Sequence, residues 1–495
     1  MVKHLLLGSR LFFFFGALCC TTITFAATMF CQTSSFSPFE RSFKVSCTAS
    51  DLPTTGKVEL RFADRFAGLE RLSERLYGLQ IRDADEQRLL PEILGDGVYR
   101  VNPNNSPSLK LEYEVRLAEV NGISRDPSKY ALTSNLSSQF GFLLLSDVLP
   151  NFFAANKVDC EPLSVRLKFQ LPDEWQVVTT EAENFGAFDV ADVERAVFFI
   201  GKLRTQLINV DQMKLHVALA GDVSLSDVQV NVLVESIARQ QATLMGSREE
   251  GDFLVTLTPF PIPLTGTRSS ALTRGRSIIM MLNPDIDSRR TLALYQKHLA
   301  HEMFHFYLPE AFKARENFDW FWEGVARYAA LLTLNRLRFI TLRDYLDEIS
   351  FEYETYAANP LRRQISLIAA SQGKFSNAAS HDLVYRKGTL VAALFDLELR
   401  TQSESRKNVM DVLRELYWNY RQRDIGNREV LAMMRNAGKF EKFIQDYIEG
   451  TQAIELAEFV KPYGLRVETV SGSPRLNVVK SLSLKQNTIL AQLGH

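Results

Sequence analysis

The chain has 495 residues, of which 46% are hydrophobic and 23% are charged, and its formal net charge is −1. A chain of this length and composition is globular and forms more than one domain. The balanced charge, with neither an acidic tail nor a basic field, argues against a nucleic-acid-binding protein.

The N-terminus has the pattern of an export signal. Lys3 and Arg10 come before or at the start of the apolar run LFFFFGALCCTTITFAA, and residues 24–27 place small side chains where a signal peptidase reads. The run is shorter than the roughly 20 apolar residues of a spanning helix, and threonines interrupt it, which favours a signal peptide over an uncleaved anchor. We expect cleavage after Ala26 or Ala27, so that the first 27 residues are a signal peptide. The mature protein would then be periplasmic or secreted and would have no integral membrane domain.

Three cysteines follow the signal segment: Cys31, Cys47 and Cys160. Export permits a disulfide, and Cys31 with Cys47 is the local candidate, but three cysteines leave one thiol over and the pairing stays open. None of the three has Cys-x-x-Cys spacing, so a thiolate metal site is not expected.

Residues 28–182 have the pattern of an N-terminal β-sandwich domain. Stretches such as GKVELRFADRF and LKLEYEVRLAEV have strand composition, and clusters such as VNPNNSPS separate them. The insert GLERLSERLYGLQ is more helical. We expect this domain to flank and shape a site that lies elsewhere.

Residues 183–335 predict a smaller mixed α/β domain. KLHVALAG, GDFLVTLTPF and RSIIMMLNP read as strands, while SLSDVQVNVLVESIARQQATLMG reads as a helix with a Ser cap and a closing Gly. Residues 336–462 predict almost only helix, and residues 463–495 predict a tail of short strands and loops. The predicted fold class is therefore multidomain α+β.

One predicted helix carries the candidate metal ligands. In KHLAHEMFHFYLPE, His301 and His305 stand one turn apart on one face, with Glu302 beside them. This is His-Glu-x-x-His, which supplies two zinc ligands and a general base. His298 lies one turn earlier and could be a fourth ligand, a partner of a ligand or a surface residue. A catalytic zinc keeps one position open, which argues against ligation by His298.

A second predicted helix, DWFWEGVARYAA, offers the third ligand that a catalytic zinc needs. Glu323 lies eighteen residues after His305, and two antiparallel helices joined by a short loop would bring it beneath the histidines. A lone carboxylate in a Trp-Phe-Trp run is costly to bury unless it is paired or metal-bound. We therefore predict one Zn²⁺ per chain, held by His301, His305 and Glu323. The alternative is an accidental motif on a polar helix face.

These motifs resemble those of the gluzincin metallopeptidases, and among them the glycyl aminopeptidase family, a relative of aminopeptidase N and leukotriene hydrolase. HEMFH and FWEGVARY resemble its zinc motifs, and VYRKGTLVAALFDLELR resembles its Tyr-x-Lys-Gly helix. The resemblance extends over roughly residues 40 to 465. It implies a thermolysin-like catalytic domain between a β-sandwich and a helical C-terminal domain. It also implies that Tyr385 donates a hydrogen bond to the oxyanion, although a tyrosine that only packs between helices is the alternative.

The sequence departs from this family in three places. Relatives carry, just before the edge strand, an acidic residue that helps to anchor a substrate's free amine, but residues 263–282, PLTGTRSSALTRGRSIIMML, contain no Asp or Glu. Ala326 replaces the threonine of the family's Glu-Gly-x-Thr-x-Tyr motif. The residues after Gly464 are too few for the PDZ domain that many relatives have.

The predicted function is an exported, aminopeptidase-like zinc metallopeptidase that hydrolyses peptide or protein substrates. The zinc activates a water, Glu302 is the general base and Tyr385 supports the oxyanion. The altered anchor segment keeps an alternative open, namely a non-catalytic binding protein on the same fold, zinc-bound or metal-free. The sequence does not determine the substrate, the preferred peptide terminus or the oligomeric state.

Overall fold

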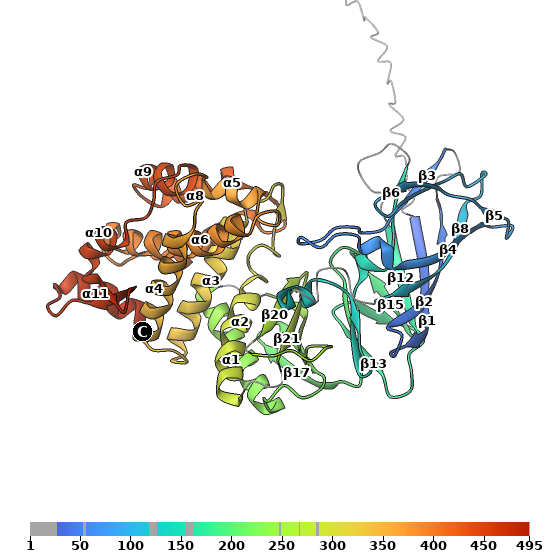
Figure 1. Cartoon of the computed structure of the whole chain (residues 1–495), viewed down its shortest axis with the longest axis horizontal. Helices are drawn as coiled ribbons and strands as arrows, with labels where there is room; N and C mark the ends of the chain where they lie inside the picture. The colour runs from blue at the N-terminus through green and yellow to red at the C-terminus, as the bar shows by residue number, and fades with distance from the viewer. Residues whose placement is uncertain are drawn as a thin grey trace, which may run out of the picture.

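The computed structural model describes residues 27–52, 56–117, 126–154, 163–246, 249–266, 268–283 and 287–494. Three regions follow one another along the molecule (Figure 1): β-sheets at one end, a mixed sheet with two helices in the middle, and a group of helices at the other end. The arrangement is a multidomain α+β fold, as predicted. The predicted signal segment up to residue 26 and Cys160 lie outside the described residues.

The N-terminal region contains three sheets around one apolar core. Alternating burial along the strands shows why they form, since apolar side chains face the core and polar ones face solvent. The eight-stranded sheet has the order β14 (Ala182–Asn184), β15 (Ala187–Val190), β12 (Leu163–Phe169), β1 (Ala27–Ser37), β2 (Ser42–Ser50), β8 (Ser108–Arg116), β4 (Leu76–Asp83), β5 (Arg88–Leu89). The four-stranded sheets are β13 (Gln176–Thr179), β16 (Val197–Gly201), β10 (Phe140–Leu144), β9 (Asn135–Leu136), and β11 (Asn151–Ala154), β3 (Val58–Arg61), β7 (Val98–Val101), β6 (Glu92–Gly95).

Strands β1 and β2 carry the disulfide that the sequence left open. Cys31 and Cys47 lie directly opposite each other in the antiparallel register, and a disulfide joins them. Because both side chains are fully buried, the bond lies inside the apolar core of this region. The local pairing that the sequence offered as a candidate is therefore present.

Two sequence expectations for this region need correction. The insert GLERLSERLYGLQ forms only one short 3₁₀ turn, Leu72–Arg75, before it enters β4, because β8 supplies backbone partners for an extended chain. Strands β15 and β16 also pair with β12 and β10, so the sheets of this region continue to Gly201, beyond the expected boundary at residue 182.

The middle region has a five-stranded sheet in the order β17 (Arg204–Val210), β18 (Met213–Leu219), β19 (Gly251–Pro259), β21 (Ser277–Leu282), β20 (Ser269–Arg274). Helix α1 (Asp227–Met245) connects the parallel strands β18 and β19; Ser226 caps its start and Gly246, at φ 55°, ends it. Helix α2 (Ser288–Phe304) packs on the same sheet. Strand β20 is at the edge of the sheet, with a single partner strand, β21.

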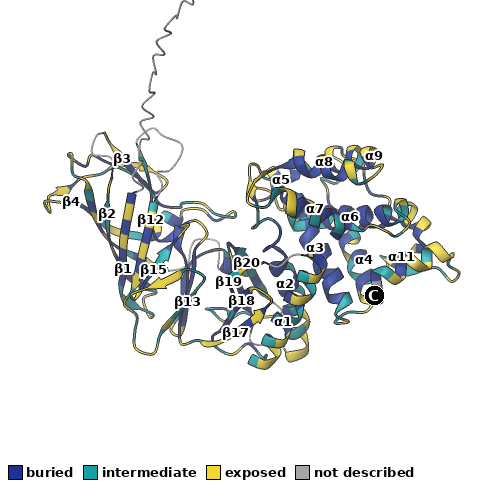
Figure 2. Cartoon of the chain, turned by 180° about the vertical axis from the view of Figure 1, so that it is seen from behind, coloured by how far each residue is buried: buried dark blue, intermediate teal, exposed yellow. Residues whose placement is uncertain are grey.

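The C-terminal region is helical. Its helices are α3 (Asp319–Arg336), α4 (Leu342–Ala358), α5 (Leu367–Gln372), α6 (Ala378–Gln402), α7 (Val409–Tyr420), α8 (Asn427–Ala437), α9 (Glu441–Ile444), α10 (Leu456–Val460) and α11 (Leu484–Gly494). Most residues of α3 and α6 are buried, as Figure 2 shows. Among the described residues, no helix combines the length and the apolar character needed to cross a bilayer.

Two glycines allow α3 and α6 to cross at very short range. A Cβ atom on Gly324 would lie 2.4 Å from the backbone carbon of Gly388, and one on Gly388 would lie 2.6 Å from the backbone oxygen of Trp320. Only glycine fits at such a contact. Each glycine lies close after a predicted site residue, Glu323 or Tyr385, so this crossing brings the two site segments together.

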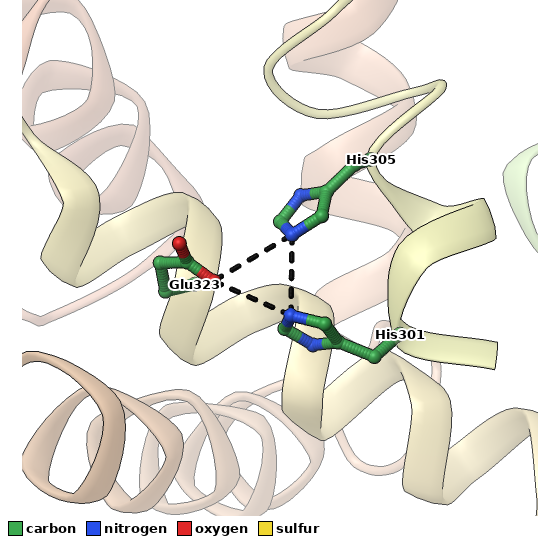
Figure 3. Close-up of side chains that lie close together, drawn as sticks. All are labelled: His301, His305 and Glu323. Carbon is green, nitrogen blue, oxygen red and sulfur yellow. Dashed lines mark hydrogen bonds and ion pairs between the residues drawn. The ribbon is translucent and has the colours of Figure 1, made fainter. Parts of the chain in front are cut away.

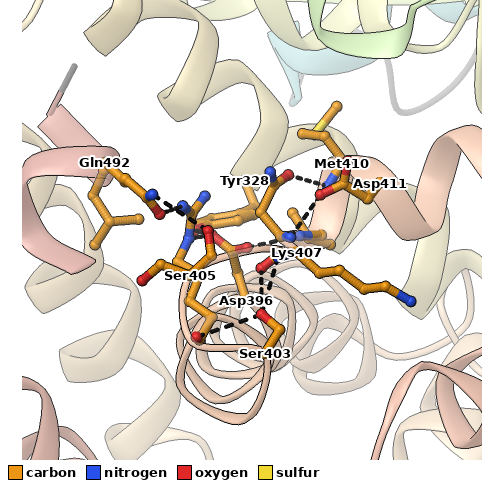
Figure 4. A network of polar contacts seen from close by, with 12 residues as sticks. Tyr328, Asp396, Ser403, Ser405, Lys407, Met410, Asp411 and Gln492 are labelled. Carbon is orange, nitrogen blue, oxygen red and sulfur yellow. Dashed lines mark hydrogen bonds and ion pairs between the residues drawn. The ribbon is translucent and has the colours of Figure 1, made fainter. Parts of the chain in front are cut away.

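A buried polar network joins α3, α6 and the end of the chain (Figure 4). The carboxylate of Asp396 accepts hydrogen bonds from the Tyr328 hydroxyl at 2.7 Å and from Arg400 Nε at 3.0 Å, and Arg400 Nη1 donates to Gln492 on α11 at 2.9 Å. The tail thus packs onto the body as a hairpin, β24 (Leu465–Val470) with β25 (Ser473–Val478), followed by α11. The hairpin strands were expected; helix α11 was not.

Candidate metal site and cleft

The two predicted zinc helices lie against each other and bring three metal-binding side chains together (Figure 3). His301 Nε2 and His305 Nε2 are 3.2 Å apart, and Glu323 Oε2 lies 3.3 Å from the first and 3.5 Å from the second. Among the described residues, these three form the group of His, Cys, Asp and Glu side chains that could hold a metal ion. His298 is not part of this group.

The spacing of these donor atoms suits a tetrahedral zinc ion. Ligand bonds of about 2.0–2.2 Å at tetrahedral angles separate neighbouring ligand atoms by about 3.3–3.6 Å. The three measured separations lie at or close to this interval. Two imidazole nitrogens and one carboxylate oxygen are also the donor set of catalytic zinc sites that keep a fourth position open.

Two of the three ligands, His305 and Glu323, have neighbours that orient them. His305 Nδ1 lies 2.8 Å from the backbone oxygen of Leu308, a contact that directs the lone pair of Nε2 toward the site. Lys374 Nζ donates to Glu323 Oε1 at 2.7 Å and approaches Asp319 at 2.8 Å. Glu323 Oε2 is buried, and its neighbours among the described residues are His301 Nε2 and His305 Nε2, at 3.3 and 3.5 Å. A buried carboxylate oxygen that faces two imidazoles fits a bound cation.

Burial and neighbouring charges shift the pKa values of all three candidate ligands. Burial alone would raise the pKa of Glu323, but Lys374 and then the two histidines hold it well below its usual value. Burial likewise lowers the pKa of His301. It acts on His305 in the same direction, but the charge and hydrogen bond of Glu323 raise the pKa of His305 to about 9. A metal that binds here therefore displaces a proton from His305.

Glu302, the predicted base, is held by a residue that sequence reasoning missed. Thr273 Oγ1 on the edge strand β20 lies 2.7 Å from Glu302 Oε2 and 2.8 Å from the Glu302 backbone oxygen. The hydroxyl can donate to either acceptor, and it joins the base to the edge strand. Lys374 was missed as well. Both contacts depend on segments far from the motif, so no spacing rule in the sequence points to them.

Tyr385 lies on α6, beside the metal site. Burial and the nearby charge of Glu323 raise its pKa, so the phenol keeps its proton and remains a hydrogen-bond donor. Lys374 Nζ lies 5.0 Å from the centre of its ring, and the ring of His381 lies 4.7 Å away. Tyr385 therefore lies in the same cleft as the other four predicted site residues, His301, Glu302, His305 and Glu323.

All five predicted residues line one cleft of about 1020 Å³. Its walls come from all three regions: residues 65–68 and 126–132 of the β-rich region, strand β20, and helices α2, α3, α4 and α6. The 3₁₀ helix Pro127–Leu132 packs on β20, where Ser270 Oγ accepts from the Ala131 backbone N–H at 2.8 Å. The β-rich region therefore shapes one end of the cleft.

No protein-family model matches the chain, and no curated protein sequence matches it significantly. Solved structures do match. An aminopeptidase N family protein from Idiomarina loihiensis is 17% identical, with a TM-score of 0.74 over 89% of this chain and 79% of that one. An M1 zinc metallopeptidase from Deinococcus radiodurans is 14% identical, with a TM-score of 0.54 over 87% of this chain and 96% of that one. A variant of that enzyme bound to a Tyr-Ser-Ala substrate gives a TM-score of 0.55 at 13% identity.

At 13–17% identity, these structures show the fold. This chain has the fold of the matched aminopeptidase N family protein and M1 zinc metallopeptidase.

Proposed function

We propose that the protein is a zinc-dependent peptidase in which His301, His305 and Glu323 hold one Zn²⁺. The observation that carries the proposal is the convergence of two imidazole nitrogens and one buried carboxylate oxygen, 3.2–3.5 Å apart, on the wall of a large cleft. When bound, zinc supplies the Lewis acidity that activates a water and polarises a carbonyl.

Glu302 acts as the general base. Its carboxylate lies next to the metal ligands, and Thr273 fixes one of its oxygens. The carboxylate takes a proton from the attacking water and later delivers it to the nitrogen of the leaving amine. Its position beside the site is what supports this role, since a binding protein has no physical need for a base there.

Tyr385 donates a hydrogen bond from its hydroxyl to the oxygen that becomes negative in the transition state. A donor that acts only on this developing charge lowers the barrier without strengthening substrate binding. The raised pKa of Tyr385 supports the role, because the phenol stays protonated at neutral pH. The edge strand β20 lies along the same cleft, and an extended peptide substrate can pair with such an edge.

Export is part of the proposal. The first 27 residues have the composition of a signal peptide, and the Cys31–Cys47 disulfide belongs to an oxidising compartment. We place the start of the catalytic domain at the strand that follows Gly201 and keep its expected end near residue 335. Helix α3 then belongs to the catalytic domain, although it also packs against the C-terminal helices. The residue range 463–495 is a docked tail.

A peptide-library digest with the purified mature chain, with and without a chelator, tests the function. We expect cleavage that the chelator abolishes and that zinc restores. Elemental analysis should find one zinc per chain in the wild type and much less in Glu323→Ala. Bound zinc without cleavage would favour the non-catalytic alternative, and equal, near-zero metal in both proteins would remove the metal site.

A further inference from the structure

Next to the metal site, the wall of the cleft carries an arginine pair: Arg327 on α3 and Arg386 on α6, which share the carboxylate of Glu352 on α4. Arg327 Nη2 donates to Glu352 Oε1 at 2.6 Å, and Arg386 Nη1 lies 2.9 Å from Oε2 and 3.1 Å from Oε1. All three residues line the cleft together with the zinc ligands. The arginine pair has no role in the chemistry described above.

The charges of the arginine pair do not balance. Two guanidinium groups face one carboxylate, which leaves a surplus of one positive charge. One turn earlier on α4, Glu348 has a single partner, Lys297, at 2.5 Å, and that pair is neutral. A buried glutamate needs one cation to offset its charge. The second arginine exceeds what Glu352 needs.

The guanidinium groups also keep free donors. Glu352 is closed off, with 3% of its side chain exposed, but Arg327 and Arg386 are 23% and 19% exposed. Each arginine gives one nitrogen to Glu352, and Arg386 Nε is buried without a hydrogen-bond partner in the part of the chain that the structure describes. A planar guanidinium with spare N–H groups suits a carboxylate, which it can bind through two parallel hydrogen bonds.

The arginine pair lies close to the reaction centre. Arg327 follows Glu323 by one turn of α3, an advance of about 6 Å along the helix, which equals about two residues of an extended peptide. Arg386 directly follows Tyr385, and the Arg327 guanidinium lies 5.7 Å from the centre of the Tyr385 ring. A group bound by the arginine pair would therefore belong to the substrate, within a few residues of the scissile bond.

We infer that Arg327 and Arg386 form a binding site for a carboxylate of the substrate. The inference rests on the proposed function, because the carboxylate is placed on a peptide held at the zinc site. The carboxylate has two sources, the C-terminus of a short peptide or the side chain of an internal Asp or Glu.

Two pairs of matched peptides test the site and distinguish the sources. The first pair differs only in a free or an amidated C-terminus; the second pair is amidated and differs only in an internal Glu or Gln. Wild-type protein should cleave one acidic member at least about tenfold more efficiently than its neutral partner, since a charge-assisted hydrogen bond contributes about tenfold to a hundredfold. Arg386→Gln and Arg327→Gln should each remove most of this preference and change cleavage of the neutral peptides by less than about threefold.

The variants should fold, because Glu352 keeps one arginine partner after either substitution. Arg343→Gln is the matched control: Arg343, on the same helix as Glu352, is likewise paired with a carboxylate, Asp347 at 2.6 Å, but it does not line the cleft. It should keep the full preference. Melting curves check the fold, and Arg327→Gln replaces Arg386→Gln if that variant does not fold.

Binding of the same peptides to Glu302→Gln, measured by calorimetry, separates the two proposals. A carboxylate preference in binding without any cleavage by the wild type would sustain the arginine site and reject the peptidase. Cleavage by the wild type with no preference in either pair would support the peptidase and reject the arginine site. Equal losses on acidic and neutral peptides in both arginine variants would show that the pair only supports the fold, and would overturn the inference.

Discussion

Helices α3 and α6 contribute to two buried groups of charged residues that differ in what they face. At the first, Glu323 of α3 and Tyr385 of α6 lie on the wall of the large cleft. At the second, Tyr328 of α3 meets Asp396 and Arg400 of α6, and none of these three lines the cleft. The two groups are close in sequence and similar in composition.

The two groups differ in how far their carboxylates are satisfied. Asp396 accepts from Tyr328 and Arg400 through one oxygen and from the Val409 backbone N–H, at 2.7 Å, through the other. Glu323 has Lys374 on one oxygen, and its other oxygen faces His301 Nε2 and His305 Nε2 at 3.3 and 3.5 Å instead of a saturating set of donors. Burial of charge alone therefore does not mark a functional site. The distinguishing features are a carboxylate oxygen that faces two imidazole nitrogens and access from a cleft.

The largest expected effect is at the cleft. Glu302→Gln should lower kcat by about 10²–10⁴-fold, because an amide cannot take the proton of the attacking water. Zinc content should not change, since Glu302 is not one of the three converging donors. Steady-state kinetics and elemental analysis check both points. Glu235→Gln, at a surface ion pair on α1, is the control and should be silent; wild-type turnover in Glu302→Gln would remove the base from the mechanism.

The matching change in the second group, formed by Tyr328, Asp396 and Arg400, is Asp396→Ala. It should lower the free energy of unfolding by about 3–5 kcal/mol, because it leaves Arg400 buried without its charge partner. The kcat per folded molecule should hold. Denaturant titration and active-site counting measure the two quantities. Asp347→Ala, at a partly exposed ion pair, should cost less than about 1 kcal/mol. A large fall in kcat of folded Asp396→Ala protein would show that the two groups are coupled.

Tyr385→Phe sharpens the comparison within the cleft. The kcat should fall by about 10²–10³-fold, because a donor to the oxyanion is lost. KM and the melting temperature should hardly change, since Phe fills the same apolar volume. If stability falls while kcat holds, Tyr385 resembles Tyr328 and serves the fold.

The smallest effect is expected at Lys374, which donates to Glu323 Oε1, the carboxylate oxygen that faces away from the histidines. Lys374→Met should weaken zinc binding by about 10–100-fold, as loss of a partner of a metal ligand usually does. Competition against a chelator of known affinity measures this. Lys374→Arg should restore part of the affinity, because it supplies a donor and the charge. Unchanged affinity in the Met variant would mean that neither the charge nor the hydrogen bond of Lys374 supports zinc binding.

Much of this protein follows from local patterns in its sequence. The spacing of His301 and His305 places both on one helix face wherever that helix sits, since 3.6 residues per turn decide it. Alternating apolar residues likewise predicted strands such as β8, in LKLEYEVRLAEV, and the Trp-Phe-Trp run around Glu323 predicted a buried carboxylate with a partner. These properties depend on neighbours within about one or two turns, so they can be predicted without knowledge of the tertiary structure.

Other properties depend on contacts between distant segments, and only the tertiary structure decided them. The register of β1 on β2 selected Cys31 with Cys47, and the pairing of β15 and β16 moved a predicted boundary. Thr273, Lys374 and the arginine pair reach the site from separate elements. The Gly324–Gly388 crossing sets how closely those elements meet. The partners of a side chain depend on how the backbone packs in three dimensions. Local periodicity does not determine which distant segments come into contact.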